Sequence, residues 1–135
     1  MNGDSNETTK SNQIARLLRR LIITTKVTYL NTGLPASQVL VNLFRFDIIT
    51  SDWVFIKNSI TGVDGTCTDL TENVTRFLDR GLYKILYNMN RDSERLYESM
   101  PLFGIIEVVF NAAHYGHYDI KILASHSGYV AYRSM

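Results

Sequence analysis

The most constraining stretch of this sequence is the run from Pro101 to Ala113 (PLFGIIEVVFNAA), in which apolar residues occupy nearly every position. On a helix, only Glu107 and Asn111 interrupt the run, and because they are four residues apart they share one edge. A helix that is apolar on almost every side is buried. The run of about a dozen residues is too short for a bilayer, which needs roughly 20. The pattern therefore predicts the central helix of a soluble bundle.

A buried parallel strand of Ile and Val is the alternative for this run, and periodicity alone does not separate the two. Pro101 suits the first turn of a helix, and the pair Ala112-Ala113 favours a helix over a strand. The helix is therefore the expected conformation.

Length and charge place few limits on function. The 135 residues are enough for one domain with a single core. Residues 1–12 are polar without an apolar period, which predicts a disordered leader before a domain at 13–135. Fourteen Lys and Arg residues balance thirteen Asp and Glu residues, so charge does not argue for nucleic acid. The single cysteine, Cys67, fits a reducing compartment, and the C-terminus carries no apolar run that would anchor it in a membrane.

Several other segments have apolar residues at three- and four-residue intervals, which predicts six or seven helices in all. The β-branched residues of 22–28 leave the end of the first helix uncertain. Glycine and proline predict turns at Asn31–Pro35 and Gly62–Gly65. The helices expected beside the central one lie at Ile14–Ile22, Pro35–Asp47, Asp69–Leu86, a short segment ending at Met100, and within 120–132.

The residues that could carry chemistry form no diagnostic motif. His114, His117 and Asp119 lie close together and could ligate a metal, but a zinc site needs further ligands at a diagnostic spacing. No nucleophile elbow and no phosphate-binding glycine pattern occurs. The sequence therefore predicts a protein that is not an enzyme and has no metal or cofactor. A metal-assisted enzyme using His114 and His117 is the alternative.

The segment from Arg95 to Phe110 (RLYESMPLFGIIEVVF) resembles the first homology region of the Bcl-2 family, and is similar to the small divergent homologues of large DNA viruses such as iridoviruses. Leu96 and Tyr97 match the Leu-Phe pair of that region, Phe103 its Trp, and Gly104 its Gly. The resemblance implies an all-α helical bundle around a buried central hydrophobic helix. The bundle would be truncated at its C-terminus, because the second homology region is absent.

This resemblance implies an anti-apoptotic viral protein in the host cytoplasm, recruited to mitochondria by its partners. It would sequester the amphipathic death-ligand helix of host pro-apoptotic proteins, such as Bim-like ligands, in a hydrophobic groove and block mitochondrial apoptosis. The family arginine that pairs with a ligand aspartate is Ile105 here, so Arg91 or Arg95 is expected to replace it. The implied groove residues are Phe44, Phe46, Phe55, Arg91, Arg95, Leu96, Tyr97, Met100, Phe103, Gly104, Ile105 and Val108.

Truncation of the bundle would leave apolar surface uncovered, which predicts a homodimer. The alternative function is a viral Bcl-2-fold interaction protein that binds a host signalling adaptor. It would use an outer helix face carrying Arg16, Arg19 and Arg20 rather than the groove.

Overall fold

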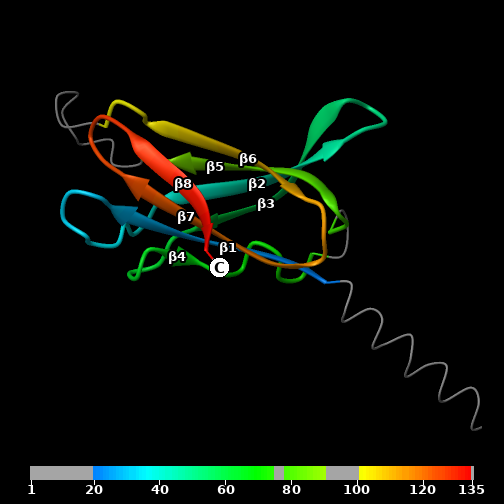
Figure 1. Cartoon of the computed structure of the whole chain (residues 1–135), viewed down its shortest axis with the longest axis horizontal. Helices are drawn as coiled ribbons and strands as arrows, with labels where there is room; N and C mark the ends of the chain where they lie inside the picture. The colour runs from blue at the N-terminus through cyan, green and yellow to red at the C-terminus, as the bar shows by residue number, and fades with distance from the viewer. Residues whose placement is uncertain (1–19, 75–77, 91–100, 135) are drawn as a thin grey trace, which may run out of the picture.

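The computed structural model describes residues 20–74, 78–90 and 101–134, and these residues form a sandwich of two four-stranded β-sheets (Figure 1). No α-helix occurs among the described residues. The strands are β1 (Leu21–Tyr29), β2 (Leu40–Asp47), β3 (Asp52–Ile60), β4 (Thr66–Cys67), β5 (Gly81–Asn88), β6 (Ile105–Ala112), β7 (Gly116–Ala124) and β8 (Tyr129–Ser134).

Sheet A has the strand order β4-β1-β7-β8, and sheet B has the order β3-β2-β5-β6. Strands β1 and β7 are parallel, although they come from opposite ends of the chain. The other neighbouring strands are antiparallel. The parallel pairing therefore places the first described strand in the middle of sheet A, directly beside residues 116–124.

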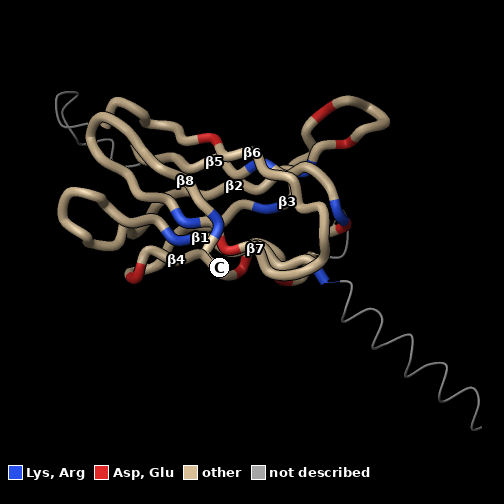
Figure 2. The backbone as a smooth tube through the Cα atoms, in the orientation of Figure 1, with Lys and Arg blue, Asp and Glu red and all other residues tan. Residues whose placement is uncertain are grey.

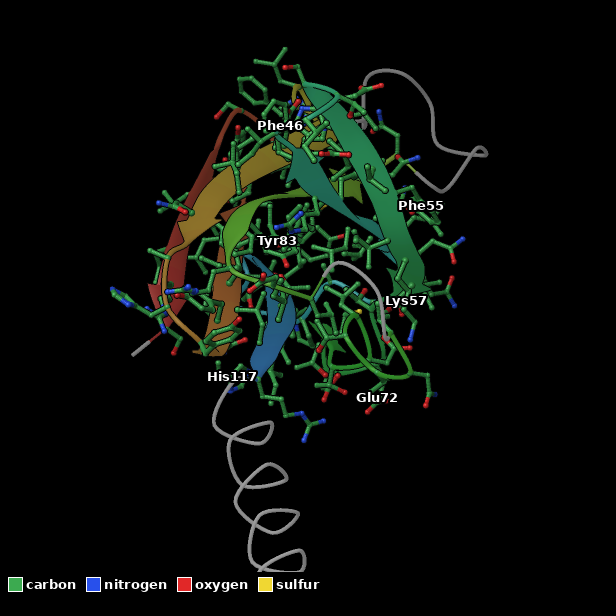
Figure 3. The ribbon with its side chains drawn as sticks, turned by 90° about the vertical axis from the view of Figure 1, so that its right-hand side faces the viewer. Phe46, Phe55, Lys57, Glu72, Tyr83 and His117 are labelled. Carbon is green, nitrogen blue, oxygen red and sulfur yellow. The ribbon has the colours of Figure 1, made fainter. Side chains whose placement is uncertain are left out.

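Period-two burial explains why these segments are strands. In β1, Leu21, Ile23, Thr25 and Val27 are at most 2% exposed, whereas Thr24 is 8% exposed and Ile22 and Lys26 are partly buried. Strands β5 and β7 alternate in the same way, and β-branched and aromatic residues favour such a half-buried pleated surface. The buried side chains from both sheets meet in one core, where Figure 3 shows Tyr83 between the layers.

The predicted central helix is wrong. Residues 105–112 of the run form β6, an antiparallel strand at the edge of sheet B. Ile106 is 1% exposed while its neighbour Ile105 is 55% exposed, so one face of the strand covers the core and the other faces outward. Only every second side chain of this strand is directed into the core. The apolar side chains between them lie at the surface, where single apolar residues are common. The alternative, a buried parallel strand, had the right conformation, but the strand pairs antiparallel with β5.

The other expected helices are also wrong where the structure describes them, and with them the all-α bundle. Leu21 and Ile22 begin β1, the segment expected as a helix to Asp47 contains β2, and the segment to Leu86 contains most of β5. Residues 120–132 lie in β7, a turn and β8. The short helix at 93–100 and the leader at 1–12 fall outside the described residues.

Both predicted turns are confirmed. In the first, the amide of Gly33 donates to the carbonyl of Tyr29, and in the second the amide of Gly65 donates to that of Gly62. Within the described ranges no helix is long and apolar enough to cross a membrane.

Candidate active site

Polar and charged side chains gather on the outer face of sheet A. Because side chains alternate along a strand, Thr24 and Lys26 of β1 project from the face opposite the core. The pairing register sets Thr24 beside Asp119 and Lys26 beside Lys121 of β7. On the other side of β1, Thr66 of β4 pairs with Lys26. Figure 2 shows the resulting group of basic segments on neighbouring strands of this sheet, next to acidic ones.

The centre of this face is a chain of three hydrogen-bonded side chains. The Thr24 hydroxyl donates to Asp119 Oδ1 over 2.8 Å and lies 2.7 Å from His117 Nε2. A threonine hydroxyl has one proton to donate, and here it is used in the hydrogen bond to the carboxylate. His117 Nε2 must therefore donate to Thr24, which leaves Nδ1 of the neutral imidazole as a proton acceptor. The structure thus fixes the tautomer of an exposed histidine through a threonine and a carboxylate.

The Asp119 carboxylate is held in its charged form. Its Oδ2 lies 3.0 Å from Lys121 Nζ. Partial burial acts to raise the pKa of Asp119, but the hydrogen bond from Thr24 and the contact with Lys121 outweigh it, so the pKa is lowered. At neutral pH this carboxylate is therefore an acceptor for Thr24 and does not donate.

Two lysines, Lys26 and Lys121, flank the three hydrogen-bonded side chains on the same face of sheet A. Lys121 is neutralised in part by Asp119, whereas Lys26 forms no ion pair with any residue that the structure describes. Arg133 of β8 donates to the carbonyl of His117 over 3.0 Å and lies over the Tyr118 ring, 4.1 Å from its centroid. Arg133 therefore anchors the start of β7. The charge of Lys26 acts on Asp64, whose pKa is lowered mainly by its hydrogen bonds with Thr66 and in smaller part by this lysine.

The metal site considered from the sequence gains no support. No group of three His, Cys, Asp or Glu side chains in residues 20–74, 78–90 and 101–134 is placed to hold a metal ion. His117 and Asp119 both contact Thr24 instead.

Three of the aromatic residues expected in a groove do come together, but on sheet B. Phe44 and Phe46 of β2 and Phe55 of β3 lie on the outer face of that sheet, where Phe44 meets Phe55 edge to face at 5.7 Å. Phe46 meets Trp53 in the same way, and the Lys84 ammonium lies over the Phe44 and Trp53 rings. Figure 3 shows Phe46 and Phe55 on the side of the molecule away from His117.

The remaining expected groove residues are divided among β6, the segment before it and the part of the chain that the structure does not describe. Phe103 and Gly104 precede β6, Ile105 begins it, and Val108 packs against the core. Gly104 lies against the side chain of Asn90. Arg91, Arg95, Leu96, Tyr97 and Met100 fall outside the described residues.

Sequence reasoning missed Thr24 and Lys26 and considered His117 and Asp119 only as metal ligands. The signal was present in the period-two pattern of Leu21–Val27, which puts Thr24 and Lys26 on one face. The same spacing in His117-Tyr118-Asp119 puts the imidazole and the carboxylate on one face. The pairing of these two segments, more than 90 residues apart, had no local signal.

Solved structures with this fold include both binding proteins and enzymes. Sea bream transthyretin in complex with thyroxine matches with a TM-score of 0.69 and 21% identity, over 83% of this chain and 93% of that one. The 5-hydroxyisourate hydrolase of Klebsiella pneumoniae matches with a TM-score of 0.66 and 19% identity, over 85% of this chain and 99% of that one. At these identities the matches establish the fold alone.

A curated relative gives a closer sequence match. The 5-hydroxyisourate hydrolase of Mus musculus is 29% identical over 113 residues, which cover 82% of this chain and 92% of the mouse protein. Relatives that carry enzyme names contradict the prediction that this chain is not an enzyme.

The Bcl-2 resemblance is wrong, because neither the fold nor any of these relatives belongs to that family. The viral anti-apoptotic function, the adaptor-binding alternative and the pro-apoptotic partners were inferred from it and are wrong too. The homodimer was inferred from the exposed surface of a truncated helical bundle, and that reason is lost with the bundle. The family model that matches, over residues 23–134, is described as transthyretin, HIUase/transthyretin family. The chain belongs to the HIUase/transthyretin family.

Proposed function

We propose that this protein hydrolyses 5-hydroxyisourate, or a closely related oxidised purine, on the outer face of sheet A. The observation that carries the proposal is the chain Asp119–Thr24–His117, which leaves a histidine nitrogen free to accept a proton. Support also comes from the mouse relative, a 5-hydroxyisourate hydrolase that aligns over 92% of its length.

His117 is the proposed general base. Hydrolysis of a ring amide requires water to add to a carbonyl carbon, after which the ring C–N bond breaks. Nδ1 of His117 takes a proton from the attacking water and returns it to the leaving nitrogen, so one water is consumed and the histidine is regenerated. Thr24 and Asp119 act as positioning residues, because they hold the imidazole in the tautomer that this step needs.

Lys26 is the proposed binding group for the substrate. An oxidised purine carries carbonyl oxygens around a flat ring, and an ammonium group without an ion-pair partner attracts such oxygens. The ring would lie over Thr24 and Asp119, with His117 at one side and the pair Lys26 and Lys121 at the other. The register of β1 and β7 places these groups in this order along the sheet.

The outer face of sheet A is open in a single chain, whereas an active site works best when water is largely excluded. Val130 and Tyr132 of β8, the edge strand of this sheet, pair with Leu123 and Lys121 and share the outer face with them, and they are 52% and 48% exposed. We therefore propose that further copies of the chain cover this face in a homotetramer, the assembly typical of transthyretin-family proteins. Sedimentation velocity would test it, and a protein that stays monomeric at high micromolar concentration would contradict it.

The activity is tested with 5-hydroxyisourate made freshly by enzymatic oxidation of urate, whose decay is followed by ultraviolet absorbance. We expect the protein to accelerate the decay well beyond the spontaneous rate. His117→Gln should lower kcat by roughly 100-fold or more, the contribution typical of a general base.

His114→Gln is the matched control, because His114 lies in the turn before β7 and its imidazole takes no part in the hydrogen bonds among Asp119, Thr24 and His117. It should keep full activity. A decay rate equal to the spontaneous one, with folded wild-type protein, would contradict the proposed function. Equal loss in both histidine variants would remove His117 from its role.

A further inference from the structure

A pocket lies at one end of the sandwich, apart from the outer face of sheet A. It has a volume of about 330 Å³ and opens where β1, β5 and β7 end and β6 and β8 begin. Pockets of this size lie at the lower end of the range for small-molecule sites. His117 and Ala124 stand near opposite ends of β7, so the pocket and the proposed active site are separated by the length of that strand.

The walls of this pocket are apolar and come from both sheets. Met89 follows β5, Phe103 precedes β6, Ile106 lies at the start of β6, and Leu34 lies in the turn after β1. The Phe103 ring meets the Tyr129 ring of β8 edge to face at 5.5 Å. The amide of Leu102 donates to the carbonyl of His126 over 2.7 Å. These two contacts join the sheets beside the pocket and keep the aromatic wall in place.

Two polar side chains of the pocket are available to a ligand. Asn31 and His126 line it, and the side chain of neither makes a hydrogen bond to a residue that the structure describes. The hydroxyls of Thr32 and Ser125 also line it but are engaged in their own turns, with the amides of Leu34 and Gly128. Asn31 and His126 both carry N–H donors, so they suit a ligand with acceptor oxygens.

We propose that this pocket binds a small aromatic acid, with its ring between Met89, Phe103 and Ile106 and its carboxylate at Asn31 and His126. The volume suits one or two fused rings. Hydrogen bonds to a charged acceptor are stronger than those to a neutral one, and a carboxylate offers two oxygens to two donors. The site is independent of the proposed hydrolysis, because it shares no residue with it.

The test is a titration of the full-length, ¹⁵N-labelled protein with indole-3-acetate, followed by NMR. We expect saturable shifts at the amides of Leu34, Ile106 and Ser125, with a dissociation constant of roughly 0.1 to 1 mM, as for other ligands of this size. Indole-3-acetamide, which is neutral, should bind about tenfold more weakly. Equal affinity for the acid and the amide would overturn the assignment of an acid.

Two pairs of variants locate the ligand. Leu34→Trp should fill the mouth of the pocket and abolish binding, whereas Leu30→Trp, at a similarly exposed position of the same turn outside the pocket, should leave it unchanged. His126→Ala should remove the preference for the acid over the amide, and His114→Ala should preserve it. Thermal unfolding of each variant checks that it is folded.

The active-site variant Lys26→Ala separates this proposal from the proposed function. Unchanged binding of indole-3-acetate to Lys26→Ala supports the pocket, whatever happens to hydrolysis. Two results together would place the acid on sheet A and overturn the proposal. One is loss of binding in Lys26→Ala. The other is wild-type shifts at amides of β1 and β7 with none at Leu34 or Ser125. Equal effects of Leu34→Trp and Leu30→Trp would also overturn it.

Discussion

Tyr87 of sheet B and Thr25 of sheet A join the two layers through a hydrogen bond of 2.6 Å between their hydroxyl groups inside the core. Thr25 uses its own proton to donate to the carbonyl of Ile120 over 2.7 Å, so Tyr87 is the donor of the inter-sheet bond. Burial raises the pKa of Tyr87 above its ordinary value, which keeps the phenol protonated for this role. The core is therefore bridged by a directed polar contact as well as by apolar packing.

Removing either side of this contact should have unequal effects. Tyr87→Phe should lower the free energy of unfolding by about 1 kcal/mol, because it leaves one acceptor site of Thr25 empty. Thr25→Val should cost about 2 kcal/mol, because it leaves a buried phenol without its acceptor and also removes the hydroxyl bond to the Ile120 carbonyl. Urea unfolding of the two variants and of the double variant measures the coupling. Strictly additive losses would show that the hydroxyl pair contributes nothing beyond packing.

Thr24→Val tests whether Thr24 acts through the His117 tautomer. Valine keeps the shape of the side chain but cannot connect His117 to Asp119. We expect kcat for 5-hydroxyisourate to fall by roughly tenfold with little change in KM, since the base is still present but less often in the useful tautomer. Thr24→Ser, which restores the hydroxyl, should recover most of the activity. A Ser variant as slow as the Val variant would contradict this role.

The lowered pKa of Asp119 predicts part of the pH dependence of stability. Partial burial raises the pKa of Asp119, but the hydrogen bond from Thr24 and the contact with Lys121 together lower it by more. The pKa in the folded state therefore lies below that in the unfolded state. Asp119 therefore contributes stability above its unfolded pKa, and that contribution is lost as the pH falls through the folded value. The unfolding free energy of Asp119→Asn should depend less on pH than that of the wild type between about pH 5 and pH 2. Parallel curves for the two proteins would contradict the prediction.

Two glycines with positive φ make a matched pair for backbone strain. Gly65 has φ of +78°, and a Cβ there would lie 2.5 Å from the carbonyl oxygen of Val27, whereas Gly33 has φ of +71° and open space around it. Gly33→Ala should cost about 1 kcal/mol from conformation alone. Gly65→Ala should cost at least about 1 kcal/mol more, because β1 must move to admit the methyl group. Equal losses in thermal unfolding would show that the close approach is relieved without cost.

The turns were the part of the fold that could be predicted from sequence. The glycines and proline at Asn31–Pro35 and Gly62–Gly65 act through their own backbone preferences, and such local effects do not depend on distant residues. The strands were misread because short apolar runs satisfy helical and strand periods at the same time. In β1, Leu21 and Ile22 continue an apparent helical stripe from Ile14, although the β-branched residues that follow favour a strand.

The sequence by itself determined the turns at Asn31–Pro35 and Gly62–Gly65, and its alternation in β1 and β7 determined which side chains share a face. The tertiary structure alone decided that β1 pairs in parallel with β7, and so that Thr24 meets both His117 and Asp119. It also decided that the apolar run before Ala113 lies at the edge of a sheet rather than at the centre of a bundle. The physical reason is that turns arise from local torsional preferences, whereas strand pairing arises from burial and hydrogen bonds between segments far apart in sequence.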